Sequence, residues 1–327
     1  MKKGISIIVT ILVLVGIAIL FAVRWNAWFA MPAEPQWNGE IIDYHFYCFG
    51  EDFVPGFVKT NVKVPYWQDT LIPDTLQIIL FGDIHNSLTH EQLDAISLRH
   101  PNVDCYAQLG DFFERLYPYY IQRNYDALKD TRFESLPVLA TPGNHEYIKG
   151  IRPRISPLWF TLFCNPLNGP IGMPPSTYYV DFAHLRFIAI DTNNLFWLRE
   201  YTRINTWVKA AIDGAGDRFV VVMMHHPIHA SARGRTNILK AAALFRAIEG
   251  ADIVFSGHDH TYSRKMPFIN TNSSNKFYSL SKKTKAESDS LWKAQSHPLY
   301  ELITVTSSSL QLETRRIDDG TLVDVWQ

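Results

Sequence analysis

Short apolar runs alternate with amphipathic stretches through most of the chain. The apolar runs are nearly continuous, which is typical of buried strands, and they occupy residues 76–81, 105–109, 136–140, 219–224 and 253–256. Apolar positions recur with helical spacing in the residues between and beyond these runs, at 89–100, 117–128, 200–213 and 238–250. Strands that alternate with helices predict an α/β fold built from packed layers.

Two local signals refine this pattern. Thr89 and Gln92 have the spacing of a capping box at the start of the first helix. Residues 177–193 contain two strand-like runs, and we expect a hairpin with its turn near Ala183 and His184.

The C-terminal part of the chain contains two segments with different sequence patterns. Residues 268–297 are rich in Asn, Ser and Lys, and we interpret them as a polar excursion on the surface. From about residue 298 the pattern predicts three strands, and Asp319-Gly320 has the composition of a tight turn in the last hairpin.

Residues 1–24 form a separate N-terminal segment. Residues 4–23 carry no charged side chain, and as a helix they would span about 30 Å, the thickness of a bilayer core. A transmembrane anchor is favoured over a cleaved signal peptide, because the apolar run is longer than a typical signal core and no A-x-A site follows it. Lys2 and Lys3 precede the span and Arg24 follows it, which favours a single-pass protein with its large domain on the extracytoplasmic side.

Composition divides the rest of the chain into a linker and one main domain. Residues 25–70 are interpreted as a juxtamembrane linker with short strands, and residues 71–327 as the main domain. With 47% apolar and 19% charged residues the chain has ample material for a core, and its formal net charge of -1 gives no reason to expect nucleic acid as a partner. The oligomeric state stays open.

The cysteines are too few for a disulfide framework. The chain has 3 of them, at positions 48, 105 and 164. Cys105 lies in an apolar stretch and is predicted to be a buried thiol. Whether Cys48 and Cys164 pair is left open.

Residues that commonly bind metal ions follow five of the strand-like runs. These segments are Asp83-Ile84-His85, Gly110-Asp111, Gly143-Asn144-His145-Glu146, His225-His226-Pro227 and Gly257-His258-Asp259-His260. Because sites in open α/β sheets form at the carboxyl ends of strands, we expect the five segments to converge. Taken alone, Asp83-Ile84-His85 and Gly110-Asp111 are common in turns, and His225-His226 could be a satisfied pair at a strand end. All five motifs in order after apolar runs nevertheless indicate one site.

The residue types in these segments fit a two-metal centre. Asp, His and Asn supply oxygen and nitrogen ligands for zinc, iron or manganese, and a carboxylate can bridge two ions about 3.5–4 Å apart. Such a pair orients a phosphate and generates a hydroxide nucleophile. We therefore expect two divalent or trivalent transition-metal ions (Mn, Fe or Zn).

The same motifs resemble the D-x-H, G-D, G-N-H-[DE], V-x-x-H and G-H-x-H blocks of the calcineurin-like metallophosphoesterase superfamily. The resemblance implies a four-layer α/β fold with two mixed β-sheets packed between helices. It implies that one metal is held by Asp83, His85, Asp111 and His260. It implies that the other is held by Asp111, Asn144, His225 and His258, with Asp111 as the bridge. His226 is left outside the ligand set, either behind the ligands or exposed.

The resemblance also implies catalytic roles for three residues. His145 is the family's candidate for protonating the leaving oxygen, a role that suits an imidazole. Gly110-Asp-Phe-Phe-Glu-Arg115 resembles the G-D-x-x-D-R block of the serine/threonine phosphatase branch, so Glu114 would orient His145 and Arg115 would bind phosphate. The alternative is that Glu114 and Arg115 form a solvated ion pair opening a helix.

Differences from the purple acid phosphatase branch narrow the prediction. His85 stands where that branch has glycine, and Glu114 where it has a metal-bound tyrosine, so no iron–tyrosinate centre is expected. The segment 165–193 nevertheless looks similar to that branch. Residues 147–177 are long and rich in aromatic residues, prolines and basic residues; they either rim a substrate pocket or pack as an ordinary surface loop.

The sequence thus predicts a membrane-anchored hydrolase that cleaves a phosphomonoester or phosphodiester by attack of a metal-bound hydroxide. Two rival classes are an inactive metal-binding scaffold anchored in the membrane and a structural membrane protein whose soluble domain only mediates contacts. Intact metal positions disfavour the first, and the second would bind no stoichiometric metal.

Overall fold

The computed structural model describes residues 74–150, 153–163, 165–173, 175–193, 198–236, 244–291 and 297–327. The predicted anchor at residues 4–23, the linker at 25–70, and Cys48 and Cys164 lie outside these residues. Across the described ranges, no helix is both long enough and apolar enough to cross a membrane. The anchor and the domain boundaries therefore stay predictions.

One of the two large sheets has six strands, in the order β15-β14-β13-β1-β2-β3. Its parallel part comprises β1 (Leu76–Phe81), β2 (Cys105–Gln108) and β3 (Val138–Ala140). Its antiparallel part comprises β13 (Leu299–Val305), β14 (Leu310–Arg316) and β15 (Leu322–Trp326). The three strands predicted for the C-terminal tail are confirmed, and Gly320 in the last turn adopts the left-handed region with φ 75°.

The other large sheet has seven strands, in the order β12-β10-β11-β9-β8-β7-β6. Its parallel strands are β7 (Leu185–Ile190), β8 (Phe219–Met224), β9 (Ile253–Ser256) and β11 (Phe268–Asn270). Antiparallel strands flank them: β6 (Tyr178–Asp181), β10 (Ser263–Lys265) and β12 (Ser290–Leu291). The pairing of β6 with β7 confirms the predicted hairpin. A small separate hairpin joins β4 (Tyr147–Ile148) to β5 (Arg154–Ile155).

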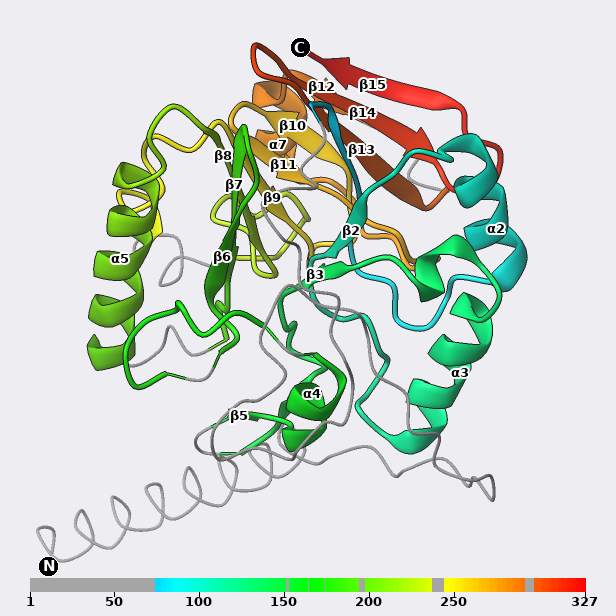
Figure 1. The fold of residues 1–327 in the computed structure, drawn as a ribbon, viewed down its shortest axis with the longest axis horizontal. Coiled ribbons are helices and arrows are strands. Elements are labelled where there is room, and N and C mark those ends of the chain that lie inside the picture. Colours follow the sequence, from blue (N-terminus) through cyan, green and yellow to red (C-terminus); the bar gives the residue numbers. More distant parts are fainter. Residues whose placement is uncertain are drawn as a thin grey trace, which may run out of the picture.

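Helices cover the outer faces of both sheets (Figure 1). The described helices are α2 (His90–Arg99), α3 (Pro118–Leu128), the 3-10 helix η2 (Arg132–Glu134), α4 (Pro157–Leu162), α5 (Leu198–Asp213) and α7 (Lys282–Glu287). The predicted capping box of α2 is confirmed, since Thr89 Oγ1 accepts the N–H of Gln92 at 3.3 Å and Gln92 Oε1 accepts that of Thr89 at 3.0 Å.

Three apolar clusters lie between these layers. One joins side chains from both sheets, such as Leu80 and Val221, and fills the space between them. A second lies on the outer side of the six-stranded sheet with α2, and a third packs α5 against the seven-stranded sheet. The α/β fold with two mixed sheets is therefore as predicted, and its layers are helix, sheet, sheet and helix.

The described part of residues 147–177 packs mainly inward. Trp159, Phe160 and Phe163 are buried in the cluster on the outer side of the six-stranded sheet. Ile171 is instead almost fully exposed, at 95%. This arrangement agrees with the packed-loop alternative for most of the stretch. Cys105 is completely buried as predicted, and burial raises the pKa of its thiol.

The interpretation of residues 268–297 as a surface excursion is wrong for their first part. Residues 271–274 are polar but buried. Ser273 Oγ accepts the N–H of Gly82 at 2.8 Å and donates to the carbonyl of Leu299 at 2.6 Å. The polar side chains thus satisfy buried backbone groups where the two sheets meet, so their composition does not indicate exposure. The later part of this stretch contains α7, which is mostly exposed, as expected.

A buried carboxyl group lies between the sheets at Glu301 in β13. Glu301 has no exposed surface, and its Oε2 lies 2.6 Å from Thr314 Oγ1. Burial raises the pKa of Glu301 to about 7. Ionising this group is therefore unfavourable in the folded protein, because the charged form loses its hydration.

We expect Glu301→Gln to stabilise the protein above pH 7. The unfolded-state pKa is near 4.3, so wild type loses stability as pH rises from about 4.5 to 7, by roughly 2–3 kcal/mol. The variant avoids this loss, and its advantage vanishes below about pH 4.5. Urea unfolding at pH 4.5 and 8 measures the difference. Glu313→Gln, on the neighbouring strand with a partly exposed side chain, is the matched control; an equal pH response in both variants would contradict the prediction.

Candidate metal centre

The predicted ligands come from the carboxyl ends of strands in both sheets. Asp83 follows β1, Asp111 follows β2, and Asn144 follows β3 in the six-stranded sheet. His225 follows β8, and His258 and His260 follow β9 in the seven-stranded sheet. A parallel bridge between Asp83 and Asn272 joins the two sheets at this edge. The structure therefore brings all five motifs together.

Several ligand positions have an unusual backbone conformation. His85, Asp111, His258 and His260 are non-glycine residues in the left-handed region, with φ of 51°, 53°, 67° and 47°. Each such residue costs on the order of 1–3 kcal/mol and persists only where surrounding structure enforces it. The concentration of this strain in the five motifs marks the region as a functional site.

Two glycines make room for the carboxylates. A Cβ atom at Gly143 would overlap Asp111 Oδ1, and one at Gly257 would overlap Asp83 Oδ1. Both carboxylates use the space to accept backbone hydrogen bonds: Asp111 Oδ1 from His145 N at 2.8 Å, and Asp83 Oδ1 from His258 N at 2.6 Å. The second oxygen of each carboxylate is thereby aimed into the site.

The first group of metal-binding atoms comprises Asp83, His85 and His260. Asp83 Oδ2 lies 3.4 Å from His260 Nε2 and 3.9 Å from His85 Nε2. This oxygen is buried and has no hydrogen-bond donor within the described residues. Burial raises the pKa of Asp83 to about 7, and it lowers that of His260 to about 3 together with the positive charges of His85, Lys276 and Arg235. The group therefore holds a poorly compensated buried carboxylate that a cation would neutralise.

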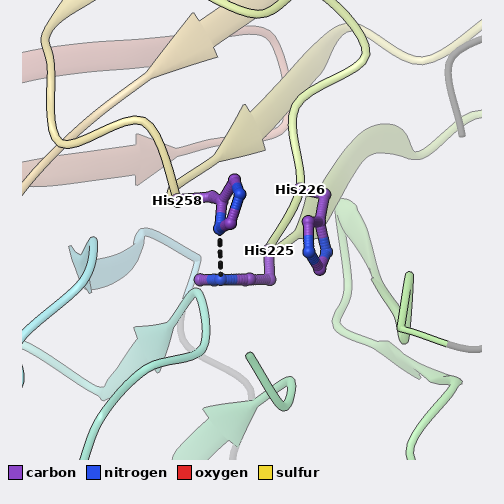
Figure 2. Close-up of side chains that lie close together, drawn as sticks. All are labelled: His225, His226 and His258. Carbon is purple, nitrogen blue, oxygen red and sulfur yellow. Dashed lines mark hydrogen bonds between the residues drawn. The ribbon is translucent and has the colours of Figure 1, made fainter. Parts of the chain in front are cut away.

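The second group comprises His225, His258 and Asn144. His225 Nε2 lies 3.2 Å from His258 Nδ1 and 3.2 Å from Asn144 Oδ1. Figure 2 shows this contact between the rings of His225 and His258, which lie at a steep angle to each other. The opposite nitrogen of His225 lies 3.0 Å from the carbonyl of Leu109, which fixes the ring.

His226 stands beside this second group. The ligand atoms of His225, His226 and His258 all lie within 4.8 Å of one another. His226 is buried, and its Nδ1 lies 2.8 Å from Thr192 Oγ1. Of the two alternatives, the structure excludes an exposed side chain, because His226 is buried beside the ligands.

Asp111 lies between the two groups. Its Oδ2 is 3.6 Å from His85 Nε2 and 3.4 Å from His225 Nε2. Burial and the negative charges of Glu146 and Asp83 raise the pKa of Asp111 well above its ordinary value. Asp111 thus has the position and the uncompensated charge of a carboxylate shared by two cations.

Glu146 has a structural role that the sequence analysis did not assign. Its Oε2 accepts the N–H groups of Asp111 at 2.9 Å and Gly143 at 2.7 Å, and its Oε1 accepts that of Phe113 at 3.2 Å. Glu146 therefore ties the loops after β2 and β3 together. The sequence signal for this role is that Glu146 occupies the acidic fourth position of the G-N-H-[DE] block.

The structure places His145, Glu114 and Arg115 at the edge of the first group. His145 Nε2 lies 3.9 Å from Asp111 Oδ2, and its Nδ1 lies 2.7 Å from the backbone carbonyl of Glu114 and contacts Arg115 Nη1. Burial, with the positive charges of His85 and Arg115, lowers the pKa of His145 to about 3.

The Glu114 side chain is closer to a different histidine. Glu114 Oε2 lies 3.1 Å from His85 Nδ1, whereas Oε1 is 3.9 Å from His145 Nδ1. Glu114 therefore contacts His145 mainly through its backbone carbonyl, while its carboxylate orients His85. The alternative of a solvated pair opening a helix does not fit, because α3 begins at Pro118 and Arg115 contacts His145.

The residues present fit two transition-metal ions. Imidazole and carboxylate donors in two groups sharing one carboxylate match the ligands of Zn, Fe and Mn. Asp83 Oδ2 has no hydrogen-bond donor among the described residues, and burial raises the pKa of both Asp83 and Asp111, so bound cations would stabilise the two carboxylates.

Comparison with known proteins agrees with this geometry. A sequence model of the calcineurin-like phosphoesterase family matches residues 76–262. No curated protein sequence matches the chain. Purple acid phosphatase PPD1 from yellow lupin has a similar structure, with a TM-score of 0.59, 14% identity, and coverage of 77% of this chain and 53% of that chain.

Two other solved structures have a similar fold. One is titled "GAP50 the anchor in the inner membrane complex of Plasmodium"; its TM-score is 0.55 at 16% identity, covering 77% of this chain and 88% of that chain. The other is PhoD, with a TM-score of 0.52 at 10% identity, covering 77% of this chain and 68% of that chain. At such identities these likenesses concern the fold alone.

Replacing Glu146 by Gln should weaken metal binding about 10–100-fold, the usual effect of losing a residue that supports ligands. A glutamine amide has one acceptor oxygen, so it cannot accept all three backbone N–H groups. Metal titration of the full-length chain measures the affinity. Glu134→Gln is the control, because Glu134 also accepts a backbone N–H, at 2.8 Å, but on an exposed turn. Wild-type affinity in the Glu146 variant would refute the role.

Proposed function

The chain belongs to the calcineurin-like phosphoesterase family, and we propose that it hydrolyses phosphoesters with two metal ions. One ion would be held by Asp83, His85, Asp111 and His260, and the other by Asp111, Asn144, His225 and His258. The observation that carries this proposal is the position of Asp111 Oδ2, within 3.6 Å of a histidine nitrogen in each group.

The bound ions would orient a phosphate ester, acidify a water molecule and offset the charge of the reacting phosphoryl group. The protein's contribution is a fixed arrangement of ligands. Glu114 orients His85, and the carbonyl of Leu109 orients His225, so little reorganisation accompanies the reaction. The donor set suits Mn, Fe or Zn.

His145 is proposed to protonate the leaving oxygen. Its Nδ1 is held by the Glu114 carbonyl, so Nε2 is the nitrogen that faces Asp111 and the reaction site. With its pKa lowered to about 3, the ring is neutral at pH 7 before substrate binds. A phosphate dianion beside it would raise that pKa, because opposite charge favours the protonated ring.

Arg115 is proposed to bind a phosphoryl oxygen. Its guanidinium contacts His145 and donates to the Glu114 carbonyl at 2.8 Å, which keeps it at the rim of the first group. A guanidinium there can form charge-assisted hydrogen bonds to phosphate.

Asp111→Asn should reduce the bound metal from two ions to one or fewer and lower turnover at least about 100-fold, because the shared carboxylate charge is lost. Elemental analysis of the full-length chain and hydrolysis of an aryl phosphate with added Mn²⁺ measure both effects. Asp126→Asn, on the exposed face of α3, should leave both unchanged. Two ions and full turnover in the Asp111 variant would exclude the dinuclear proposal.

His145→Ala should lower turnover about 10²–10⁴-fold while two ions stay bound. The loss should be larger for an alkyl phosphate than for an aryl phosphate, since an aryl oxide leaves without needing a proton. Single-turnover hydrolysis of both substrates, together with metal analysis, makes the measurement. His90→Ala on the surface of α2 is the control. An equal loss on both substrates would argue against a proton-donor role.

A membrane-anchored scaffold without catalytic activity is the second candidate function. The similarity in fold to GAP50, the anchor in the inner membrane complex of Plasmodium, favours it, as does the apolar segment at residues 4–23. For either function, we propose that the chain crosses the membrane once and that its domain lies on the extracytoplasmic side. Assaying the metal-loaded chain on phosphomonoesters and phosphodiesters separates the candidates, because the scaffold predicts bound metal without hydrolysis.

A further inference from the structure

A loop of the seven-stranded sheet is fixed directly to the metal centre. Residues 231–235 follow β8, and Asp259, between ligands His258 and His260, holds their first part. Asp259 Oδ2 accepts the N–H groups of Ser231 at 2.6 Å and Ala232 at 3.0 Å. Because Asp259 is fully buried, these bonds couple the position of the loop to the ligand segment.

The same loop is also held from its other side. Ala232 forms an antiparallel bridge with Leu280, and the N–H of Arg233 donates to the carbonyl of Ser279 at 2.7 Å. Thr284 Oγ1 donates to the carbonyl of Ser231 at 3.0 Å. Residues 231–235 are therefore held in place from both sides.

This loop carries one arginine to the second metal group. Arg235 Nη1 lies 2.6 Å from His258 Nε2, and its guanidinium lies over the Tyr278 ring, 4.9 Å from the centroid. The Tyr278 ring is in turn 5.0 Å from the ring of His260. Lys276 Nζ lies 5.5 Å from the same Tyr278 ring, which adds another positive charge beside the ligands.

An open pocket of about 340 Å³ lies against these cations. It is lined by Arg233, Gly234, Arg235, Tyr278 and Ser279. Of the ion pairs found within the described residues, none involves Arg233, Arg235 or Lys276. The pocket is thus a cationic space next to the centre, since two of its lining residues, Arg235 and Tyr278, contact the ligands His258 and His260.

We propose that Arg233 and Arg235 bind a second phosphate group of the substrate, so that the enzyme prefers phosphoesters whose leaving group carries another phosphate. Guanidinium groups match phosphate oxygens in pairs, and the two arginines that line the pocket suit a dianion. This inference rests on the proposed phosphoesterase function and names its substrate class. Asp259 is the positioning residue for the loop.

The test compares two substrates with the same carbon skeleton, 1,3-propanediol bisphosphate and propyl phosphate. The full-length chain is loaded with Mn²⁺, and the ratio of the two kcat/KM values is measured. We expect the wild-type ratio to favour the bisphosphate and to fall about tenfold in Arg233→Ala and in Arg235→Ala, as for the loss of a charged hydrogen bond. The ratio cancels any general effect of Arg235→Ala on metal binding.

Lys285→Ala is the matched control, because Lys285 is an exposed cation on α7 that does not line the pocket. It should leave the ratio unchanged. Hydrolysis of both substrates with a wild-type ratio in the two arginine variants would overturn the subsite and leave the proposed function intact.

Absence of hydrolysis by the wild-type enzyme would instead refute the proposed function. The subsite is then judged by calorimetric binding of the bisphosphate to the Mn²⁺-loaded chain. A loss of affinity of about tenfold in Arg233→Ala supports it, and unchanged affinity overturns it.

Discussion

The structure depends on the burial of two carboxylates, Asp83 and Asp111, where the carboxyl ends of two sheets meet. Each has one oxygen satisfied by a backbone N–H from the neighbouring motif and a second oxygen facing histidine rings. Burying such charge without compensation is unfavourable, and the pKa of both groups is raised. The site therefore has a strong electrostatic preference for cations, and the backbone hydrogen bonds to Asp83 and Asp111 keep the ligands in place.

Two further buried carboxylates support this arrangement from outside. Glu146 joins the loops after β2 and β3 by accepting three backbone N–H groups. Asp259 performs the equivalent task in the other sheet, where it fixes the loop after β8. The six-stranded sheet thus supplies both cation-binding carboxylates, whereas each sheet has one acidic residue that holds loops in place.

The two sides of the centre differ in charge and hence in proposed task. Beside the first group, Glu114 orients His85, and Arg115 lies against His145, where we place proton donation and phosphate binding. Beside the second group, Arg235 and Tyr278 line a cationic pocket that contains none of the predicted metal ligands. We therefore place the chemical step beside the first group and recognition of the leaving group beside the second.

The sequence by itself determined the strands that lead to the site, the helix α2 and the family, because apolar runs, the capping box at Thr89 and five ordered motifs are local signals. It also placed the ligand residues at strand ends, which the sheets then brought together. Only the tertiary structure decided which groups face each other: that Glu114 turns its carboxylate to His85, that Glu146 and Asp259 hold loops, and that polar residues 271–274 are buried. These contacts join residues distant in sequence, and composition does not encode whether a polar side chain meets water or a buried backbone group.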